Sequence, residues 1–351
     1  MTLEELREKV RKWDFQHTGS AEAISEYGMI LNQLEHHARR EWRVYLPAEH
    51  FDFNASYMER LATWIGNVTD ELDQKLMLQY ALYISFISHD DFAALYRTAL
   101  DREVSSWVVS QIGARLDSNG GQALNDLLTK EVQYHTWFCP VTDSMDINEF
   151  YKVNHLEGVA HRPGFATLQM LAEKAKTQDP ALAENIIHYM SNPRRSAIAP
   201  GPELKRLVLL EDFVGTGTQC IEAIRWAAEK VRKPVLFVPL ILCPNGAKAL
   251  REIEQQFDGQ LTVSPVIEIH RRDLLGPERM GQQGSPITEA VEALVRRFAK
   301  RVNAESAPFG FKDTGCSLVT FSNTPNNSIP MIHSRPKDGE WEPLFPRVFR
   351  D

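Results

Sequence analysis

Long apolar runs, an excess of basic charge and paired cysteines are all missing from this 351-residue sequence. No segment approaches the ~18 consecutive apolar residues of a membrane-spanning helix. The net charge of −8 argues against direct binding of nucleic acid. The first residues are charged and lack the apolar core of a signal peptide. We therefore expect a cytoplasmic protein without membrane association.

Cysteine is also scarce. The four cysteines are widely spaced and form no CxxC pair, which argues against a structural zinc site. Free, buried thiols are the expectation, and Cys220 should pack the first turn of a helix. Hydrophobic residues make up 43% of the chain and charged residues 25%, as in ordinary folded proteins. This length suits one large domain or two ordinary ones.

The most informative stretch begins with the apolar run Leu207–Leu210, which predicts a strand buried on both faces, as in a parallel sheet. The acidic residues Glu211 and Asp212 follow it. A loop of small and hydroxyl residues comes next, formed by Gly215, Thr216, Gly217 and Thr218. A helical pattern begins directly after this loop, and the free N–H groups at a helix start bind anions. The stretch therefore suits a ligand that carries a phosphate together with hydroxyls or a metal.

This pattern closely resembles the phosphoribosyl-diphosphate signature of type I phosphoribosyltransferases, in which an apolar strand leads into two acidic residues and a small-residue loop. The resemblance implies that Glu211 and Asp212 are the catalytic-site partners of the ribose 2′ and 3′ hydroxyls. It also implies that Gly215–Thr218 holds the 5′-phosphate. Family members that use purines carry an acidic residue at the position of Gly215, so purine recognition of the usual kind is not expected here.

The sequence pattern divides the chain into three regions. Residues 1–125 read as a helical region, residues 126–270 alternate strands with helices, and residues 271–351 read as a helix followed by a strand-rich extension that completes the site. The expected fold is therefore α/β. It has a parallel-sheet core like that of type I phosphoribosyltransferases, an N-terminal all-helical region and a C-terminal hood-like extension. Further strands are predicted at 134–141, 234–242 and 261–270.

A second strand–loop–helix unit lies upstream, with Thr142–Asp146 as its loop. By position this loop resembles the one that holds the pyrophosphate of the donor in the family. The residues that the resemblance then implies are Thr142, Asp143, Ser144 and Asp146. Carboxylates that face a diphosphate need Mg²⁺ between them, so Mg²⁺ with a diphosphate ligand is the implied cofactor. The alternative is a Ser or Asp N-cap of the following helix and nothing more.

Two other segments each have two interpretations. Residues 191–202 are rich in proline and lie where the family has a mobile flap, so Arg194 and Arg195 would meet the leaving pyrophosphate. A surface linker is the alternative. Residues 322–327 carry amides that would anchor a base or a ribose, or else serve a tight turn. These amides belong to Asn323, Asn326 and Asn327.

Together with Trp341–Arg347, these motifs resemble the phosphoribosyltransferase-like proteins of bacterial conflict (anti-phage) systems. Some members of that branch are encoded with a retron reverse transcriptase and a winged-helix protein. The resemblance implies an effector that binds phosphoribosyl diphosphate or a nucleotide and, if it is an enzyme, a glycosyltransferase. One alternative is a non-catalytic nucleotide sensor or regulatory subunit of a defence nucleoprotein complex. Another makes the helical region a partner-binding surface.

Overall fold

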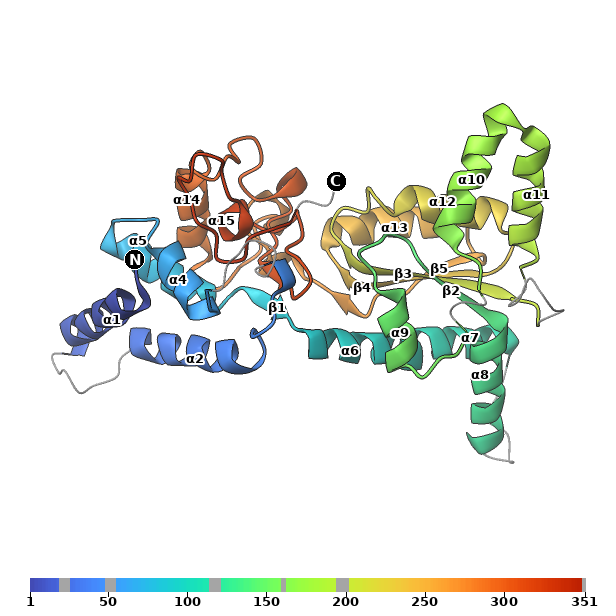
Figure 1. Ribbon diagram of the computed structural model, residues 1–351, viewed down its shortest axis with the longest axis horizontal. Coiled ribbons are helices and arrows are strands. Elements are labelled where there is room, and N and C mark those ends of the chain that lie inside the picture. Colours follow the sequence, from blue (N-terminus) through green and yellow to red (C-terminus); the bar gives the residue numbers. More distant parts are fainter. Residues whose placement is uncertain (19–25, 48–54, 114–120, 159–161, 194–201, 349–351) are drawn as a thin grey trace. The chain divides into compact units, whose positions relative to one another are not determined.

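The chain folds into two compact units (Figure 1). The terminal unit comprises Met1–Phe92 and His270–Asp351, and the central unit comprises Ala93–Ile269. Residues 1–125, expected as one helical region, contribute to both units. The structure is a computed structural model that describes residues 1–18, 26–47, 55–113, 121–158, 162–193 and 202–348.

The central unit is built on a parallel sheet. Its strands are β2 (Thr136–Pro140), β3 (Arg206–Val214), β4 (Val235–Leu242), β5 (Leu261–Val263) and β6 (Ile267–Glu268). They follow the order β2-β3-β4-β5, and β6 also pairs with β4. The parallel α/β core predicted from the sequence is thus confirmed. The run expected as one strand at 261–270 forms two short strands, because Pro265 between them has no N–H to donate to the ladder.

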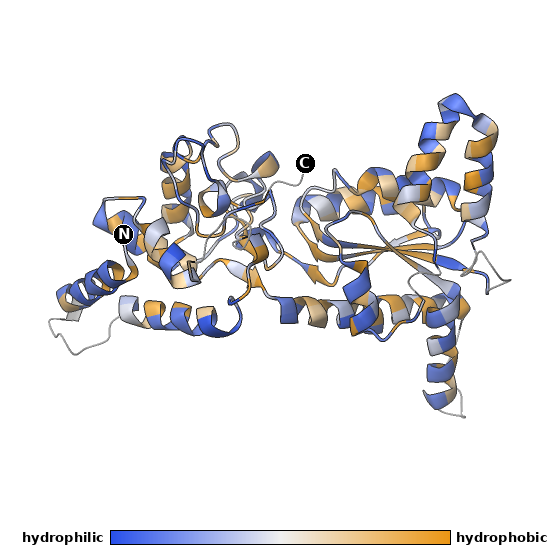
Figure 2. Cartoon of the chain, in the orientation of Figure 1, coloured by the Kyte–Doolittle hydropathy of each residue, from blue (hydrophilic) through white to orange (hydrophobic). Residues whose placement is uncertain are grey.

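Helices cover both faces of this sheet (Figure 1). On one face, Leu207 and Leu209 of β3 pack in a core cluster with residues of α10, α12 and α13. On the other face, the ring of Phe138 lies 5.5 Å from that of Phe150 in α9. Burial on both faces explains the largely apolar colouring of the central strands in Figure 2. The helices of the unit are α7 (Ser105–Ile112), α8 (Gly121–His135), α9 (Ile147–Val153), α10 (Phe165–Gln178), α11 (Pro180–Ser191), α12 (Ile221–Lys230) and α13 (Pro244–Gln256).

Helix α6 (His89–Thr98) starts in the terminal unit and continues through a π-helical turn, η1 (Ala99–Val104), into α7 of the central unit. In the terminal unit, β1 (Ser85–Ile87) pairs in parallel with β7 (Leu318–Thr320). The expectation of an all-helical N-terminal region is wrong at β1, because pairing with a distant strand overrides the local helical pattern around Phe86. The helices of the terminal unit are α1 (Leu3–Thr18), α2 (Glu26–Arg40), α4 (Tyr57–Ile65), α5 (Glu71–Ala81), α14 (Thr288–Phe298) and α15 (Pro330–His333).

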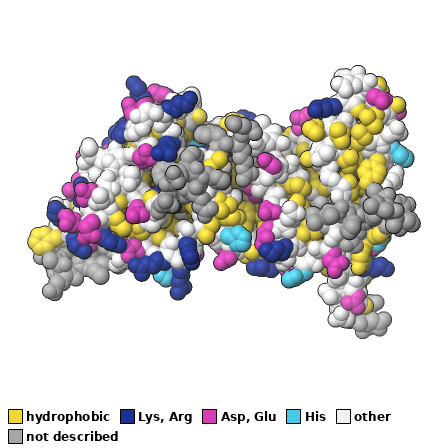
Figure 3. All heavy atoms as spheres, in the orientation of Figure 1, with side chains coloured by type: hydrophobic (Ala, Val, Ile, Leu, Met, Phe, Trp, Pro, Cys, Tyr) yellow, Lys and Arg dark blue, Asp and Glu magenta, His cyan; other side chains and the backbone are white. Residues whose placement is uncertain are grey.

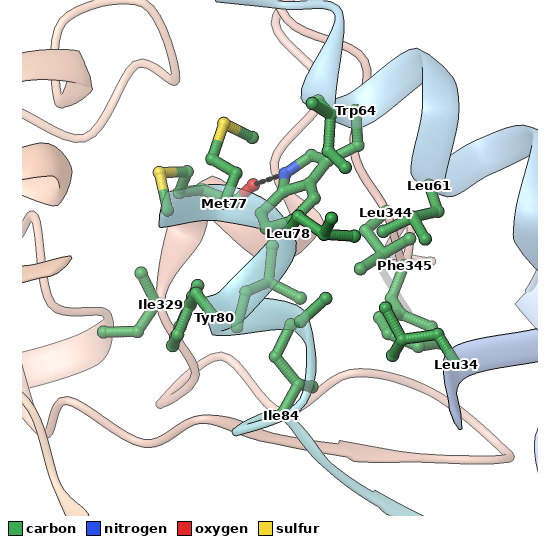
Figure 4. Packing of buried hydrophobic residues seen from close by; sticks show 14 of the residues in the cluster. Leu34, Leu61, Trp64, Met77, Leu78, Tyr80, Ile84, Ile329, Leu344 and Phe345 are labelled. Atoms are coloured by element: carbon green, nitrogen blue, oxygen red, sulfur yellow. Dashed lines mark hydrogen bonds between the residues drawn. The ribbon is translucent and has the colours of Figure 1, made fainter. Parts of the chain in front are cut away.

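One hydrophobic core joins the first and last segments of the terminal unit (Figure 4). Trp64 of α4 is fully buried, and its indole N–H donates to the carbonyl oxygen of Met331 at 2.8 Å. Trp341 donates to the same carbonyl oxygen at 3.0 Å. A buried indole needs such an acceptor. The buried aromatic residues of the N-terminal helices therefore belong to a packed core.

Some apolar side chains remain on the surface. Figure 3 shows them over α10 and α11, where Met170, Leu171 and Leu182 are each more than two-fifths exposed. None of the helices that the structure describes has the length and hydropathy needed to cross a membrane. All four cysteines are buried and free, as predicted.

Candidate functional site

The acidic pair lies inside strand β3, not after it. The ladder with β4 continues beyond the predicted strand end at Leu210, as far as Val214 opposite Leu242. Glu211 is 3% exposed and Asp212 is 9% exposed. Because side chains alternate along a strand, the two carboxylates leave the backbone toward opposite faces. Both carboxylates are therefore held within the sheet and need donors of their own.

The loop after β2 supplies those donors, because β2 and β3 are parallel neighbours. The Thr142 N–H and hydroxyl donate to the two carboxylate oxygens of Glu211 at 3.1 and 2.7 Å. The Ser144 hydroxyl donates to Asp212 Oδ1 at 2.8 Å, and the two hydroxyl oxygens lie 2.7 Å apart. The Phe213 N–H also donates to Asp212, at 2.8 Å. The structure thus brings together Thr142, Ser144, Glu211 and Asp212.

The surroundings of Glu211 favour its protonated form. Burial, and after it the neighbouring Asp212 carboxylate, raise the pKa of Glu211 to about 8, against the lowering effect of the Thr142 hydrogen bonds. The number of hydrogens available for the hydrogen bonds agrees with this raised pKa. Three oxygen–oxygen contacts run from Glu211 through Thr142 and Ser144 to Asp212, whereas the two hydroxyls supply only two hydrogens. A hydrogen in the third contact would come from a protonated carboxyl group, which the raised pKa of Glu211 favours.

The loop Gly215–Thr218 connects β3 to α12 and presents unused donors. The N–H groups of Gly215, Thr216, Gly217 and Gln219 have no acceptor in the described part of the chain. Gly217 has φ +78°, a left-handed conformation that glycine adopts without strain. Its carbonyl oxygen accepts from the N–H groups of Cys220 and Ile221, which starts the helix. Free N–H groups at a helix start favour an anion.

Neighbouring elements support this loop. The Gly246 N–H in the first turn of α13 donates to the Gly215 carbonyl oxygen at 3.0 Å. A Cβ at Gly246 would lie only 3.0 Å from that oxygen. Cys220 is buried, with its thiol 3.4 Å from the Gly217 carbonyl oxygen, and burial raises its pKa to about 12. Its role in packing the helix start is therefore as predicted. Sequence reasoning missed the supporting role of Gly246, although the glycine after Pro244 at a strand end was visible.

The other predicted site residues have different surroundings. Asp146 caps α9, because its carboxylate accepts from the Glu149 N–H at 3.0 Å. This is the alternative that the sequence left open, while a pyrophosphate contact stays a prediction. Asp143 is exposed. Arg194 and Arg195 lie outside the described residues.

The asparagines of the C-terminal loop belong to the terminal unit. The Asn323 amide donates to the Val348 carbonyl oxygen and accepts from the Val348 N–H. Asn327 is buried, and its amide donates to Thr314 Oγ1 at 2.8 Å. Asn326 is exposed, and its side chain makes no hydrogen bond to any described residue. A contact between these residues and a base or ribose stays a prediction.

The donor set around Glu211 suits a hard cation, because it consists of carboxylate and hydroxyl oxygens. Nevertheless, the described residues contain no cluster of three or more His, Cys, Asp or Glu side chains arranged for a metal ion. Any Mg²⁺ at this edge of the sheet would therefore draw most of its ligands from a diphosphate and water.

A parallel sheet with an acidic pair in one strand, followed by an open N–H loop at a helix start, is the arrangement of a phosphoribosyltransferase-like protein. The sequence model of the PRTase-CE family matches residues 61–347, which is most of the chain. The protein belongs to this family, which is phosphoribosyltransferase-like and associated with conflict systems. No curated protein and no solved structure matches the chain.

Proposed function

We propose that the protein binds phosphoribosyl diphosphate, or a nucleotide with the same ribose 5-phosphate group, as an effector of a bacterial antiviral defence system. One observation supports the choice of this ligand. Two buried carboxylates, Glu211 and Asp212, lie shortly before a loop in which the N–H groups of Gly215, Thr216 and Gly217 have no acceptor among the described residues. Carboxylates accept hydrogen bonds from sugar hydroxyls, and free N–H groups donate hydrogen bonds to a phosphate.

Each part of the ligand has its own residues in this proposal. Glu211 and Asp212 bind the ribose 2′ and 3′ hydroxyls, and the loop Gly215–Thr218 binds the 5′-phosphate. The diphosphate on C1 lies by the loop Thr142–Asp146, with Arg194 and Arg195 closing over it. Mg²⁺, when bound with the diphosphate, would neutralise its charge.

Transfer of the phosphoribosyl group would replace one bond at the ribose C1 atom with another. The bond from C1 to the pyrophosphate oxygen breaks, pyrophosphate leaves with the bonding electrons, and a nucleophile on the acceptor forms the new bond and loses its proton. Positive charge develops on the ribose ring, as it does in glycoside chemistry. Hydrogen bonds from the ribose hydroxyls to Glu211 and Asp212 would hold C1 in place while this happens.

Calorimetry with phosphoribosyl diphosphate and Mg²⁺ tests the ligand. Asp212→Asn should abolish detectable binding, because it removes the charge that receives a ribose hydroxyl, while circular dichroism remains that of the wild type. Asp258→Asn, an exposed change in the same unit, serves as the matched control and should bind normally. Equal affinity of Asp212→Asn and wild type would contradict the proposal.

A second function is favoured by Gly215, which occupies the position where purine-using relatives carry an acidic residue. Without that residue, the site would recognise the ribose phosphate and act as a nucleotide sensor or regulatory subunit that transfers nothing. Mass spectrometry after incubation with Mg²⁺, the donor and a nucleotide pool separates the two functions. New ribosylated products are formed only by an enzyme.

The association of the family with conflict systems also supports a proposal about partners. We expect the chain to assemble with a retron reverse transcriptase and a winged-helix protein, with contacts that include the N-terminal helices. Co-purification from cells that express the neighbouring genes tests this assembly. A monomer free of nucleic acid under those conditions would count against it.

A further inference from the structure

Two hydroxyl groups, those of Thr142 and Ser144, form hydrogen bonds with the acidic pair. Thr142 Oγ1 and Ser144 Oγ lie 2.7 Å apart. The first is 2.7 Å from Glu211 Oε1 and the second is 2.8 Å from Asp212 Oδ1. Each carboxylate therefore meets one member of a close pair of hydroxyls. The neighbouring 2′ and 3′ hydroxyls of a ribose would present themselves to the same two carboxylates in the same way.

We propose that the Thr142 and Ser144 hydroxyls are an internal substitute for the ribose diol, so that a ribose ligand has to displace them from Glu211 and Asp212. This inference rests on the proposed function, because it assumes that the acidic pair is the ribose site. It adds a competitor that belongs to the chain itself and lowers the apparent affinity for ligand.

The surrounding contacts limit how far this loop has to move. At its start, the Val141 N–H donates to the Leu210 carbonyl oxygen at 2.9 Å. At its end, Met145 is 3% exposed and Asp146 caps α9. The segment between these anchors is only Thr142–Ser144, and it is half-buried or exposed. Displacement is therefore a local movement of three residues, with both ends of the loop held in place.

The cost of displacement follows from population arithmetic. A ligand that binds only the open form has its affinity reduced by the fraction of molecules in that form. Hydrogen bonds to charged groups are strong enough to change such a fraction about tenfold each. Released hydroxyls are also free to donate to a diphosphate on the same ligand. Release of the two hydroxyls would thus couple binding of the ribose to binding of the diphosphate by the loop Thr142–Asp146.

A purely structural role for the two hydroxyls makes a different prediction. Buried carboxylates require hydrogen-bond donors in any protein. If Thr142 and Ser144 did nothing else, their removal would lower stability and leave ligand affinity unchanged or weaker. Under our proposal, their removal makes ribose binding tighter, because the competitor is gone.

The test uses the full chain with Thr142→Val and Ser144→Ala, singly and together. Thr177→Val in α10 is the matched control, because its hydroxyl bonds only to a backbone carbonyl of its own helix. Ribose 5-phosphate is the probe for calorimetry, since it carries the diol and the phosphate but no diphosphate. We expect each single variant to bind ribose 5-phosphate about tenfold more tightly than wild type. The control should bind it with the affinity of wild type. The gain should be smaller with 2-deoxyribose 5-phosphate, which lacks one hydroxyl.

Thermal unfolding of each variant shows whether a change in ligand affinity comes from a loss of the folded structure. If wild type binds ribose 5-phosphate and the folded variants bind it no more tightly, the internal substitute is overturned while the proposed ligand stands. If neither wild type nor any variant binds ribose 5-phosphate or phosphoribosyl diphosphate, the proposed function fails, and this inference fails with it. Binding that appears only in the variants would support the proposal most directly.

Discussion

Two polar loops of this protein, Gly215–Thr218 in the central unit and residues 322–327 in the terminal unit, differ in what their polar groups do. Both stand between apolar segments, and both suggest ligand binding on sequence grounds. In the terminal unit, Asn323 and Asn327 direct their amides to their own chain. In the central unit, the N–H groups of Gly215, Thr216 and Gly217 have no acceptor among the described residues.

Residue type alone is therefore a poor guide to a binding loop. A polar group can bind a ligand strongly only if folding has not already satisfied it. Asparagine side chains satisfy backbone groups readily, so a cluster of them is compatible with a purely structural loop. Backbone N–H groups at a helix start cannot be satisfied within the helix, so they remain available.

The largest expected effect is on ligand affinity in Gly217→Val. A Cβ at this position would lie 3.0 Å from Ile221 Cδ1, and φ of +78° disfavours a β-branched residue. The loop would change shape and lose its aligned N–H groups. We expect affinity for phosphoribosyl diphosphate to fall at least ~100-fold in calorimetry, which corresponds to about 2.8 kcal/mol.

Gly259→Val is the control for this change, because Gly259 has φ +76° and an open surrounding. It introduces the same backbone strain in the same unit and should leave ligand affinity unchanged. Equal losses of affinity in both variants would mean that general strain, not the loop, determines binding.

The asparagines provide the reverse test. Asn327→Ala removes a buried amide that is bonded to the Thr314 hydroxyl, so we expect a loss of about 1–3 kcal/mol in the free energy of unfolding. Asn326→Ala changes an exposed side chain and should alter stability by less than ~0.5 kcal/mol. Denaturant titration measures both. Weaker ligand binding by Asn326→Ala at unchanged stability would instead place this loop in the site.

A pH dependence is expected from Glu211. Its pKa is raised to about 8, so its proton stabilises the fold at low pH. That stabilisation is lost as pH rises from the ordinary glutamate value, near ~4.3, through about 8, because only the unfolded chain releases the proton in this window. Glu211→Gln cannot titrate, and its midpoint of thermal unfolding should rise relative to wild type by several degrees across this range.

Glu252→Gln, an exposed change in α13, is the control for this experiment and should follow the wild type at every pH. Parallel curves for wild type and Glu211→Gln between pH 5 and 9 would show that Glu211 is already ionised in the folded protein.

The smallest expected effect is stabilisation by inorganic phosphate. At about ten times its dissociation constant, phosphate bound at the Gly215–Thr218 loop should stabilise the protein by about 1.4 kcal/mol. In differential scanning fluorimetry this corresponds to a few degrees. Gly217→Val should show no such shift, whereas Asn326→Ala should show the full shift. A shift of the same size in Gly217→Val would place the anion elsewhere.

Much of the central unit could be predicted from the sequence. The apolar runs before Glu211 and Cys243 are strands β3 and β4, since only a strand covered on both faces has such a composition. Strand β1 could not be predicted, because it has three residues and is formed by pairing with β7 from the other end of the chain. The extension predicted to be strand-rich contains one named strand, β7, among its described residues. The Trp64 and Trp341 contacts with Met331 depend on the same long-range packing.

The family, the buried parallel strands, the acidic pair and the small-residue loop follow from the amino-acid sequence, because these depend on local composition and order. Long-range packing, in contrast, places Glu211 and Asp212 within the β3–β4 ladder and brings the Thr142 and Ser144 hydroxyls to their oxygens. It also decided that the Asn323 and Asn327 amides are used by the fold. The physical reason is that whether a polar group is free depends on which neighbour folding brings to it, and those neighbours are distant in sequence.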